Sequence, residues 1–231
     1  MADPNLEILT KVADALGELR ERMTFVGGCA TGLLITDPGA SPVRATQDVD
    51  AVVAVVSRVD YRQLGAALRA KGFAQPLEEG APAFRWSMAG LKLDVMPSDP
   101  GILGFSNRWY AHVMRRAFKA RLSSDIEIRV ADAPSFIATK LEAFLDRGAG
   151  DYLSSHDLED VLSIVDGRPE LVGELRAADP QLRAFVGTTL ADLLADEGFL
   201  NALPGLVLEG SPAVRTPIVL QRLRQLAELR N

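Results

Sequence analysis

The feature that most constrains this chain is a pair of aspartates at the start of an apolar, β-branched run. Asp48 and Asp50 stand two residues apart, and the apolar residues 51–56 follow them at once. Because side chains alternate along a strand, both carboxylates point to the same face. Buried together they would repel, and one would stay protonated unless a divalent cation such as Mg²⁺ compensated their charge. The pair therefore predicts either a metal site at the mouth of a buried strand or two solvated turn residues ahead of it.

Two further segments favour the metal site. A short apolar run stops at Gly27 and Gly28, and residues 29–35 then predict a short buried helix. Glycines at a strand-to-helix turn leave backbone N–H groups open to an anion. Farther along, residues 91–96 predict a second apolar strand with Asp94 at its centre, where a carboxylate is costly without a partner. If the two strands lie side by side, the three acids explain one another as ligands of a metal.

The hydrophobic pattern extends this core into an α+β fold. Alternating or continuous apolar runs predict strands at residues 23–26, 49–56, 73–77, 84–88, 91–96 and 126–130. Helical periodicity predicts helices at residues 5–22, 60–71, 108–116, 134–148, 154–165, 169–178, 180–196 and 213–230, with a loop at 203–212. The strand at 49–56 is apolar on both faces and is predicted to be central, whereas the alternation at 126–130 predicts an edge strand. A two-residue turn at Ala89 and Gly90 predicts a hairpin with Trp86 opposite or nearly opposite Leu93.

The order of the motifs resembles the nucleotidyltransferase superfamily with the polymerase-β-like fold. Within that superfamily the chain looks similar to the AbiEii-type nucleotidyltransferases, which include toxins of type IV toxin–antitoxin systems. The long interval between the glycine pair and the acid pair suits this branch, and so does a later helical block. The positions that carry the resemblance are Gly27, Gly28, Arg44, Thr46, Asp48, Asp50, Asp94, Lys140 and Asp157. It covers residues 20–166 and is specific through the order of the motifs.

The resemblance implies a mixed sheet flanked by helices over residues 1–130 and a helical domain over residues 131–231. It also implies Mg²⁺- or Mn²⁺-dependent transfer of a nucleoside monophosphate from NTP to an acceptor hydroxyl. The three acids would hold the metals and act in catalysis, with Asp94 also able to accept the acceptor's proton. Gly27 and Gly28 would let the backbone approach the triphosphate, and Thr46, at the lip of the site, would bind the nucleotide.

Two site residues rest on the resemblance alone. Lys140 would lie against the triphosphate as a catalytic and nucleotide-binding cation, and Asp157 would contact the nucleotide or support the residues that do. By residue type, Lys140 would instead be a surface cation whose stem covers apolar atoms. Asp157, near the start of its helix, would instead complement the helix dipole.

The sequence leaves two classes of acceptor, an RNA and a small molecule. The resemblance suggests an RNA, such as the 3′ end of a tRNA, and a cognate antitoxin protein as partner. A net charge of −6 argues against a broad nucleic-acid surface and favours a small-molecule, antibiotic-type acceptor. A local basic cluster fits phosphates and a stacked base, or else a solvated amphipathic helix. Its members are Arg108, Trp109, Tyr110, Arg115, Arg116, Phe118, Lys119 and Arg121. A non-catalytic protein that binds a nucleotide or a partner is the alternative outside the enzyme class.

Composition narrows the setting. One cysteine excludes an intramolecular disulfide, and two histidines with that cysteine make a poor zinc site. The apolar runs are far shorter than the roughly 20 residues that span a bilayer, and the start of the chain lacks a signal-peptide pattern. We therefore expect a cytoplasmic protein without a membrane partner.

Overall fold

The computed structural model describes residues 3–55, 57–78, 80–147, 150–207 and 212–230. These residues form two compact units. The sheet unit comprises Pro4–Ala30 and Ala45–Asp132, and the helical unit comprises Thr31–Arg44 and the chain from Ala133 onward, together with Asp3. The boundary predicted at residue 130 stays a prediction. The predicted ends at Val56 and Gly148, and residues 208–211 of the predicted loop, lie outside the described residues.

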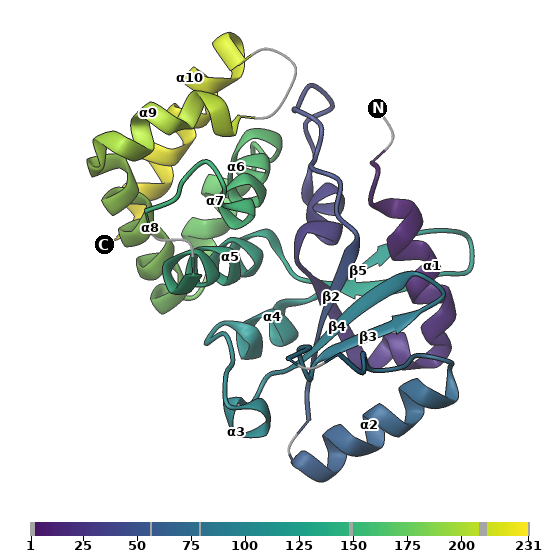
Figure 1. Ribbon diagram of the computed structural model, residues 1–231. Helices are drawn as coiled ribbons and strands as arrows, with labels where there is room; N and C mark the ends of the chain where they lie inside the picture. Colours follow the sequence, from purple (N-terminus) through teal and green to yellow (C-terminus); the bar gives the residue numbers. More distant parts are fainter. Residues whose placement is uncertain (1–2, 56, 79, 148–149, 208–211, 231) are drawn as a thin grey trace. The chain divides into compact units, whose positions relative to one another are not determined.

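The sheet unit is built on one mixed sheet with the strand order β3-β4-β2-β1-β6-β5 (Figure 1). Its strands are β1 (Met23–Val26), β2 (Asp48–Val53), β3 (Arg85–Met88), β4 (Leu91–Pro97), β5 (Phe118–Arg121) and β6 (Glu127–Val130). β2 is antiparallel to β1 and parallel to β4, so its predicted central position is confirmed. A mixed sheet flanked by helices and followed by a helical unit confirms the predicted α+β class.

One face of the sheet is an apolar core, because alternate residues of β2 and β4 are apolar and all of them except Leu91 are buried. Val49 and Ala51 lie beside Leu93 and Val95 in the parallel register. The β3–β4 hairpin pairs Trp86 with Leu93, which confirms that prediction. Because side chains alternate, Asp50 and Asp94 point to the opposite face.

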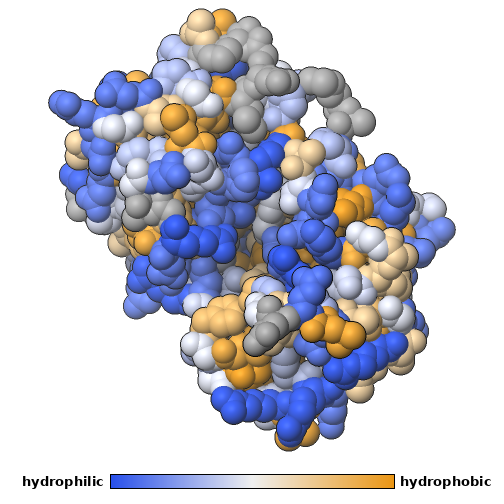
Figure 2. Space-filling model, in the orientation of Figure 1, coloured by the Kyte–Doolittle hydropathy of each residue, from blue (hydrophilic) through white to orange (hydrophobic). Residues whose placement is uncertain are grey.

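Helices cover this unit on the outside. They are α1 (Leu6–Leu16), α2 (Arg58–Ala70), α3 (Pro100–Leu103) and α4 (Tyr110–Arg116), with 3₁₀ turns at Gly17–Arg22 and Gly28–Leu34. α2 starts where Ser57 accepts a hydrogen bond from the Asp60 amide, a side-chain cap that supplies one of the first-turn donors with an acceptor. Its buried Leu64 and Leu68 face inward, and hydrophilic side chains cover its outer face (Figure 2).

Three sequence predictions need correction in this unit. Residues 73–77 form no strand and contribute one isolated bridge, Ala74 to Ser87, because Pro76 has no amide hydrogen for a ladder. β6 is an interior strand between β1 and β5, since residues 118–121 supply the edge strand that the alternating pattern did not reveal. The short helix predicted at 29–35 is the 3₁₀ turn Gly28–Leu34.

The helical unit contains longer helices packed around their own core. They are α5 (Ala133–Arg147), α6 (His156–Gly167), α7 (Leu171–Ala177), α8 (Pro180–Ala195), α9 (Glu197–Leu206) and α10 (Pro212–Ala227), with a final 3₁₀ turn Glu228–Arg230. α5 packs on α6 and α8, and α10 packs on α6 and α8. α9 was not predicted and takes in the first part of the predicted 203–212 loop. None of the described helices is long and apolar enough to cross a membrane.

Candidate functional site

The strand register brings the three predicted acids onto one face of the sheet. β2 and β4 run parallel with Asp50 directly opposite Asp94 and Asp48 opposite Lys92. Farther along the same face the residues become apolar, and the Tyr110 hydroxyl of α4 contacts Met96 at 3.0 Å. The acids therefore lie toward the N-terminal ends of β2 and β4, and the apolar residues of this face lie toward their C-terminal ends. Asp94 is only 5% exposed, whereas the side chain of Asp48 is 33% exposed.

Gly27 lies hard against Asp50. It has φ +73°, a left-handed conformation that favours glycine, and a Cβ built on it would come within 1.9 Å of Asp50 Oδ2. The β1–β2 register explains this contact because Val26 pairs with Asp50 and Gly27 follows Val26 directly. A glycine is thus needed at this position both for its backbone conformation and for the room that the carboxylate occupies.

A buried asparagine that the sequence reasoning missed joins the two loops beside the acids. Asn5 is fully buried, its Oδ1 accepts from the Thr46 amide at 2.9 Å, and its Nδ2 donates to the Gly28 carbonyl at 3.5 Å. The Thr46 hydroxyl in turn accepts from the Asp48 amide at 3.5 Å. Gly28 and Thr46 are therefore held on either side of one side chain, close in sequence to Gly27 and Asp48.

Arg85 is the second residue that sequence reasoning missed. Its Nε donates to Asp94 Oδ1 at 2.8 Å and its Nη2 to Asp94 Oδ2 at 2.7 Å, a two-pronged ion pair. Nη2 also reaches Asp48 Oδ2 at 3.1 Å. The hydrogen bond to Asp94 raises the pKa of Arg85, so the guanidinium stays charged. The predicted hairpin contained the signal for this contact, since pairing Trp86 with Leu93 places Arg85 opposite Asp94.

The donor chemistry of the acids fits a hard divalent cation. Asp48 Oδ1 is buried and, among the described residues, has no hydrogen-bond partner, although the Lys92 ammonium lies 3.6 Å away. Carboxylate oxygens of this kind are the ligands that Mg²⁺ and Mn²⁺ prefer. In the part of the chain that the structure describes, no three Asp, Glu, His or Cys side chains are placed to hold one ion. Arg85 engages both oxygens of Asp94, and this engagement sets the position of that carboxylate.

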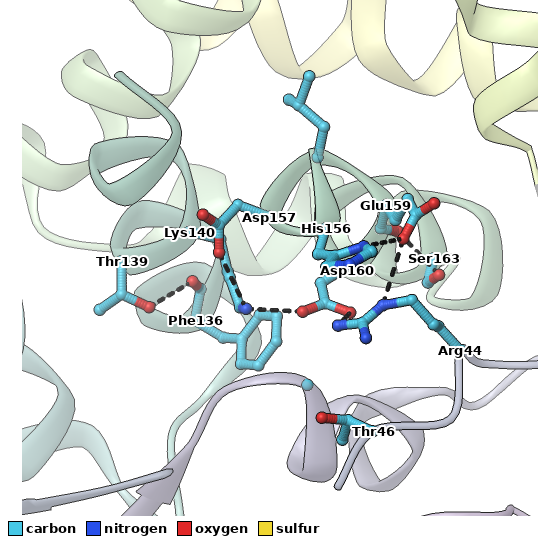
Figure 3. A network of polar contacts seen from close by, with 12 residues as sticks. Arg44, Thr46, Phe136, Thr139, Lys140, His156, Asp157, Glu159, Asp160 and Ser163 are labelled. Atoms are coloured by element: carbon cyan, nitrogen blue, oxygen red, sulfur yellow. Dashed lines mark hydrogen bonds and ion pairs between the residues drawn. The ribbon is translucent and has the colours of Figure 1, made fainter. Parts of the chain in front are cut away.

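The other predicted residues, Lys140 and Asp157, meet in the helical unit (Figure 3). Lys140 of α5 points at two carboxylates of α6 and lies 3.1 Å from Asp157 Oδ1 and 2.6 Å from Asp160 Oδ2. Arg147, two helical turns farther along α5, donates to both oxygens of Asp157. Ser155 caps α6 by accepting from the Leu158 amide, which fixes where these acids stand.

Arg44 completes this helical cluster, which we define as Arg44, Lys140, Arg147, Asp157, Glu159 and Asp160. Arg44 Nε lies 3.2 Å from Glu159 Oε2, and its Nη2 lies 3.7 Å from Asp160 Oδ1. The segment that carries Arg44 is anchored to the C-terminal end of α6, where the Gly167 carbonyl accepts from the amides of Thr36 and Asp37 at 2.9 Å. The sequence analysis placed Arg44 in a motif with Asp48, whereas in the structure its ion pairs are with α6.

The basic cluster is divided between two elements. Arg115 and Arg116 end α4, and Lys119 lies on the edge strand β5. Lys119 pairs with Glu127 at 2.7 Å and Arg116 with Asp132 at 3.5 Å, so part of the positive charge is compensated. The single helix considered as an alternative is not formed, because the chain extends after Arg116.

Comparisons with known proteins found similar structures but no matching protein family. No protein-family model matches the chain, and neither does any curated protein. The crystal structure of JHP933 from Helicobacter pylori is 13% identical, covers 100% of this chain and 93% of that chain, and has a TM-score of 0.50. The crystal structure of an antigenic nucleotidyltransferase-like protein from Paracoccidioides brasiliensis is 20% identical, covers 92% and 97% of the two chains, and has a TM-score of 0.49. At these identities the likeness concerns the fold alone.

Proposed function

We propose that this protein is a metal-dependent nucleotidyltransferase that moves a nucleoside monophosphate from NTP to an acceptor hydroxyl and releases pyrophosphate. The observation that carries the proposal is the register of β2 and β4, which sets Asp50 opposite Asp94 and keeps Asp48 on the same face. Three carboxylates on one sheet face suit the divalent cations that stabilise phosphoryl transfer. The order of motifs in the sequence supports the same activity and the AbiEii-type assignment.

Each residue has a task in this proposal. Asp48 and Asp50 hold Mg²⁺ or Mn²⁺, which supplies charge neutralisation at the phosphates, and Asp94 completes the set and accepts the proton of the acceptor hydroxyl. Gly27 and Gly28 leave the turn after β1 without side chains, so backbone amides can approach an anion. Lys140, Asp157 and Thr46 keep their predicted roles at the nucleotide.

A labelling assay tests the activity directly. Purified protein is incubated with each α-³²P-labelled NTP, Mg²⁺ and total RNA, and in parallel with a panel of small hydroxyl compounds. We expect label to move to an acceptor in a metal-dependent manner and to be lost when a chelator is added. Absence of transfer from all four NTPs to any acceptor, with a protein that binds no NTP, would contradict the proposal.

RNA is the proposed acceptor, with the 3′ end of tRNA as the first substrate to test and a toxin role under control of an antitoxin as its biological setting. The cations of α4 and β5, beside the half-exposed Phe118, support an RNA-docking face. Transfer to RNA should then fall steeply with salt, because each neutralised phosphate releases counterions. Changing Arg115, Arg116 and Lys119 together to Ala should reduce the salt slope by about two to three and leave NTP binding unchanged.

A small-molecule acceptor is the second candidate because Lys119 and Arg116 already pair with acids. It predicts a transfer rate that is insensitive to salt between roughly 50 and 200 mM. Under this alternative the triple variant would transfer label as fast as the unchanged protein.

A further inference from the structure

We propose that Arg85 is an exchangeable internal counter-ion, which a divalent cation must displace from Asp94 and Asp48 before the three acids can act as metal ligands. The inference rests on the proposed function, because it assumes that these acids bind a metal. Arg85 lies outside the sequence motifs. In this proposal it competes with the metal ion for the carboxylates of Asp48 and Asp94.

Arg85 neutralises the carboxylates that a metal ion would otherwise neutralise. Its guanidinium satisfies both oxygens of Asp94 and one oxygen of Asp48 with donor distances of 2.7–3.1 Å. Asp94 is almost fully buried, and a buried carboxylate without a partner is strongly unfavourable. In the absence of a metal the arginine therefore supplies the positive charge that the acids require.

The same contacts leave Arg85 able to move away. Its side chain is 30% exposed, and it extends from β3, which is the end strand of the sheet. Release needs a change of side-chain rotamers and leaves the β3–β4 hydrogen bonds in place. The guanidinium would pass into water, where its hydration offsets part of the lost ion pair.

Competition can be distinguished from a supporting role by the sign of one effect. If Arg85 competes, removing it leaves carboxylates that repel one another and bind a divalent cation more tightly. If Arg85 instead orients Asp94 as a metal ligand, removing it weakens binding, by about 10- to 100-fold where such supporting residues have been changed. A neutral substitution at this position therefore separates the two roles.

The experiment measures Mn²⁺ binding to the full chain without nucleotide, using the electron paramagnetic resonance signal of free Mn²⁺. Arg85→Gln should bind Mn²⁺ about 10- to 100-fold more tightly than the unchanged protein, the range expected when charge-assisted hydrogen bonds no longer need to be broken. Arg69→Gln is the matched control, because it removes the same charge from α2 on the opposite face, where Arg69 stacks on Trp86. Its Mn²⁺ affinity should stay within about twofold, as expected for a distant exposed charge.

Two further measurements test whether a divalent cation displaces Arg85. In the unchanged protein, Mg²⁺ should shift the Arg85 Nε–H resonance, identified by its loss in Arg85→Lys, toward that of a solvated arginine. If Arg85→Gln does not fold, Arg85→Lys, which keeps the charge but loses the two-pronged contact, should bind Mn²⁺ more tightly than the unchanged protein. Equal or weaker Mn²⁺ binding by the folded variant overturns the competition and leaves the metal site intact. Failure of the unchanged protein and of every variant to bind Mn²⁺ overturns the competition and the proposed metal site together.

Discussion

Two of the described clusters of acids and basic side chains contain predicted site residues, and they differ in how open they are. On the sheet, Asp48 and its partner Arg85 have side chains that are about one third exposed, while Asp94, the other partner of Arg85, is buried. In the helical cluster, the Lys140 side chain is 12% exposed and that of Asp160 only 4%. Exposed ion pairs contribute little stability and exchange partners readily, whereas breaking a buried pair leaves an uncompensated charge. The same residue types therefore suit an exchangeable ligand site on the sheet and a fixed connection between helices in the helical unit.

The elements that carry the two clusters explain the difference. The sheet acids project from neighbouring strands of one face, and the arginine that neutralises them extends from β3, the end strand of the sheet. The helical acids lie on α6 and point at α5 and at the Thr31–Arg44 segment, so their partners come from elements packed around them (Figure 3). Five experiments test whether the two clusters differ in this way.

The largest effect is expected from Asp48→Asn combined with Asp50→Asn. Nucleotide transfer should fall on the order of 10³-fold, because the cation that neutralises the phosphates is lost. The free energy of unfolding should change by no more than about 1 kcal/mol, since the ion pairs of Asp48 are partly exposed. Transfer assays and urea unfolding provide the two numbers.

The control for this double variant is Glu21→Gln combined with Asp125→Asn, which removes two exposed charges from the same unit. It should alter neither quantity. A double Asp48/Asp50 variant that still shows a Mg²⁺–NTP thermal shift of full size would remove the metal role from these residues.

Lys140→Ala should have the largest effect on stability. It removes one of the two cations beside each of the buried Asp157 and Asp160, which keep Arg147 and Arg44, and loss of such a charge-assisted contact costs about 1.5–3 kcal/mol. Urea unfolding measures the change, with Lys11→Ala as control, because Lys11 pairs with Glu7 in an exposed pair of one helix and should cost less than about 0.5 kcal/mol. If the two lysine variants unfold alike, the helical cluster is not a fixed connection.

The same Lys140 variant tests the nucleotide role that the sequence predicts. If Lys140 contacts the β- and γ-phosphates, affinity for NTP should fall roughly 10- to 100-fold while affinity for NMP changes little. Titrations at a temperature where the variant is folded decide this. Equal losses for NTP and NMP would restrict Lys140 to its structural contacts.

Gly27→Ala should disturb the sheet acids more than a comparable change elsewhere. Both Gly27 and Gly90 have positive φ, but a Cβ meets Asp50 at Gly27 and nothing within 4 Å at Gly90. Both variants therefore pay the same cost for a positive φ at a non-glycine residue. Gly27→Ala must also displace Asp50, so its free energy of unfolding should fall by about 1–3 kcal/mol more than that of Gly90→Ala. Mn²⁺ binding should weaken in Gly27→Ala alone. Variants of equal stability and equal Mn²⁺ affinity would show that the close approach of Gly27 has no functional part.

The smallest effect concerns pH and the anchor of the Arg44 segment. The amide of Gly39 and the guanidinium of Arg215 lower the pKa of Asp37, so its charged form contributes stability above the unfolded pKa of about 3.9. This contribution is lost as the pH falls through the lower folded pKa. Asp37→Asn should cost about 0.5–1 kcal/mol at pH 7 and almost nothing at about pH 2, as measured by urea unfolding at both values. A cost that does not change with pH would assign the loss to the side-chain shape instead of its charge.

The elements whose signals are local could be predicted from the amino-acid sequence. The β-branched strand after Asp50, the turn at Ala89 and Gly90 and the helix α6 all formed as predicted, because strand alternation, turn chemistry and helical periodicity act within a few residues. The position of Asp48 and Asp50 on the same face of the strand likewise followed from the two-residue period of a strand. These local rules were sufficient to predict the α+β class and to choose the candidate acids.

The tertiary structure alone decided which charges meet. Arg85 reaches beyond its hairpin neighbour Asp94 to Asp48 on β2, and Asn5 bonds to Gly28 and Thr46, which lie 23 and 41 residues farther along the chain. Burial requires each polar group to find a partner wherever the packing brings one. Arg44 follows the same rule, since its segment packs with the helical unit although its sequence neighbours belong to the sheet. A periodic pattern specifies the face on which a side chain lies, and only the packing of distant segments specifies what lies opposite that face.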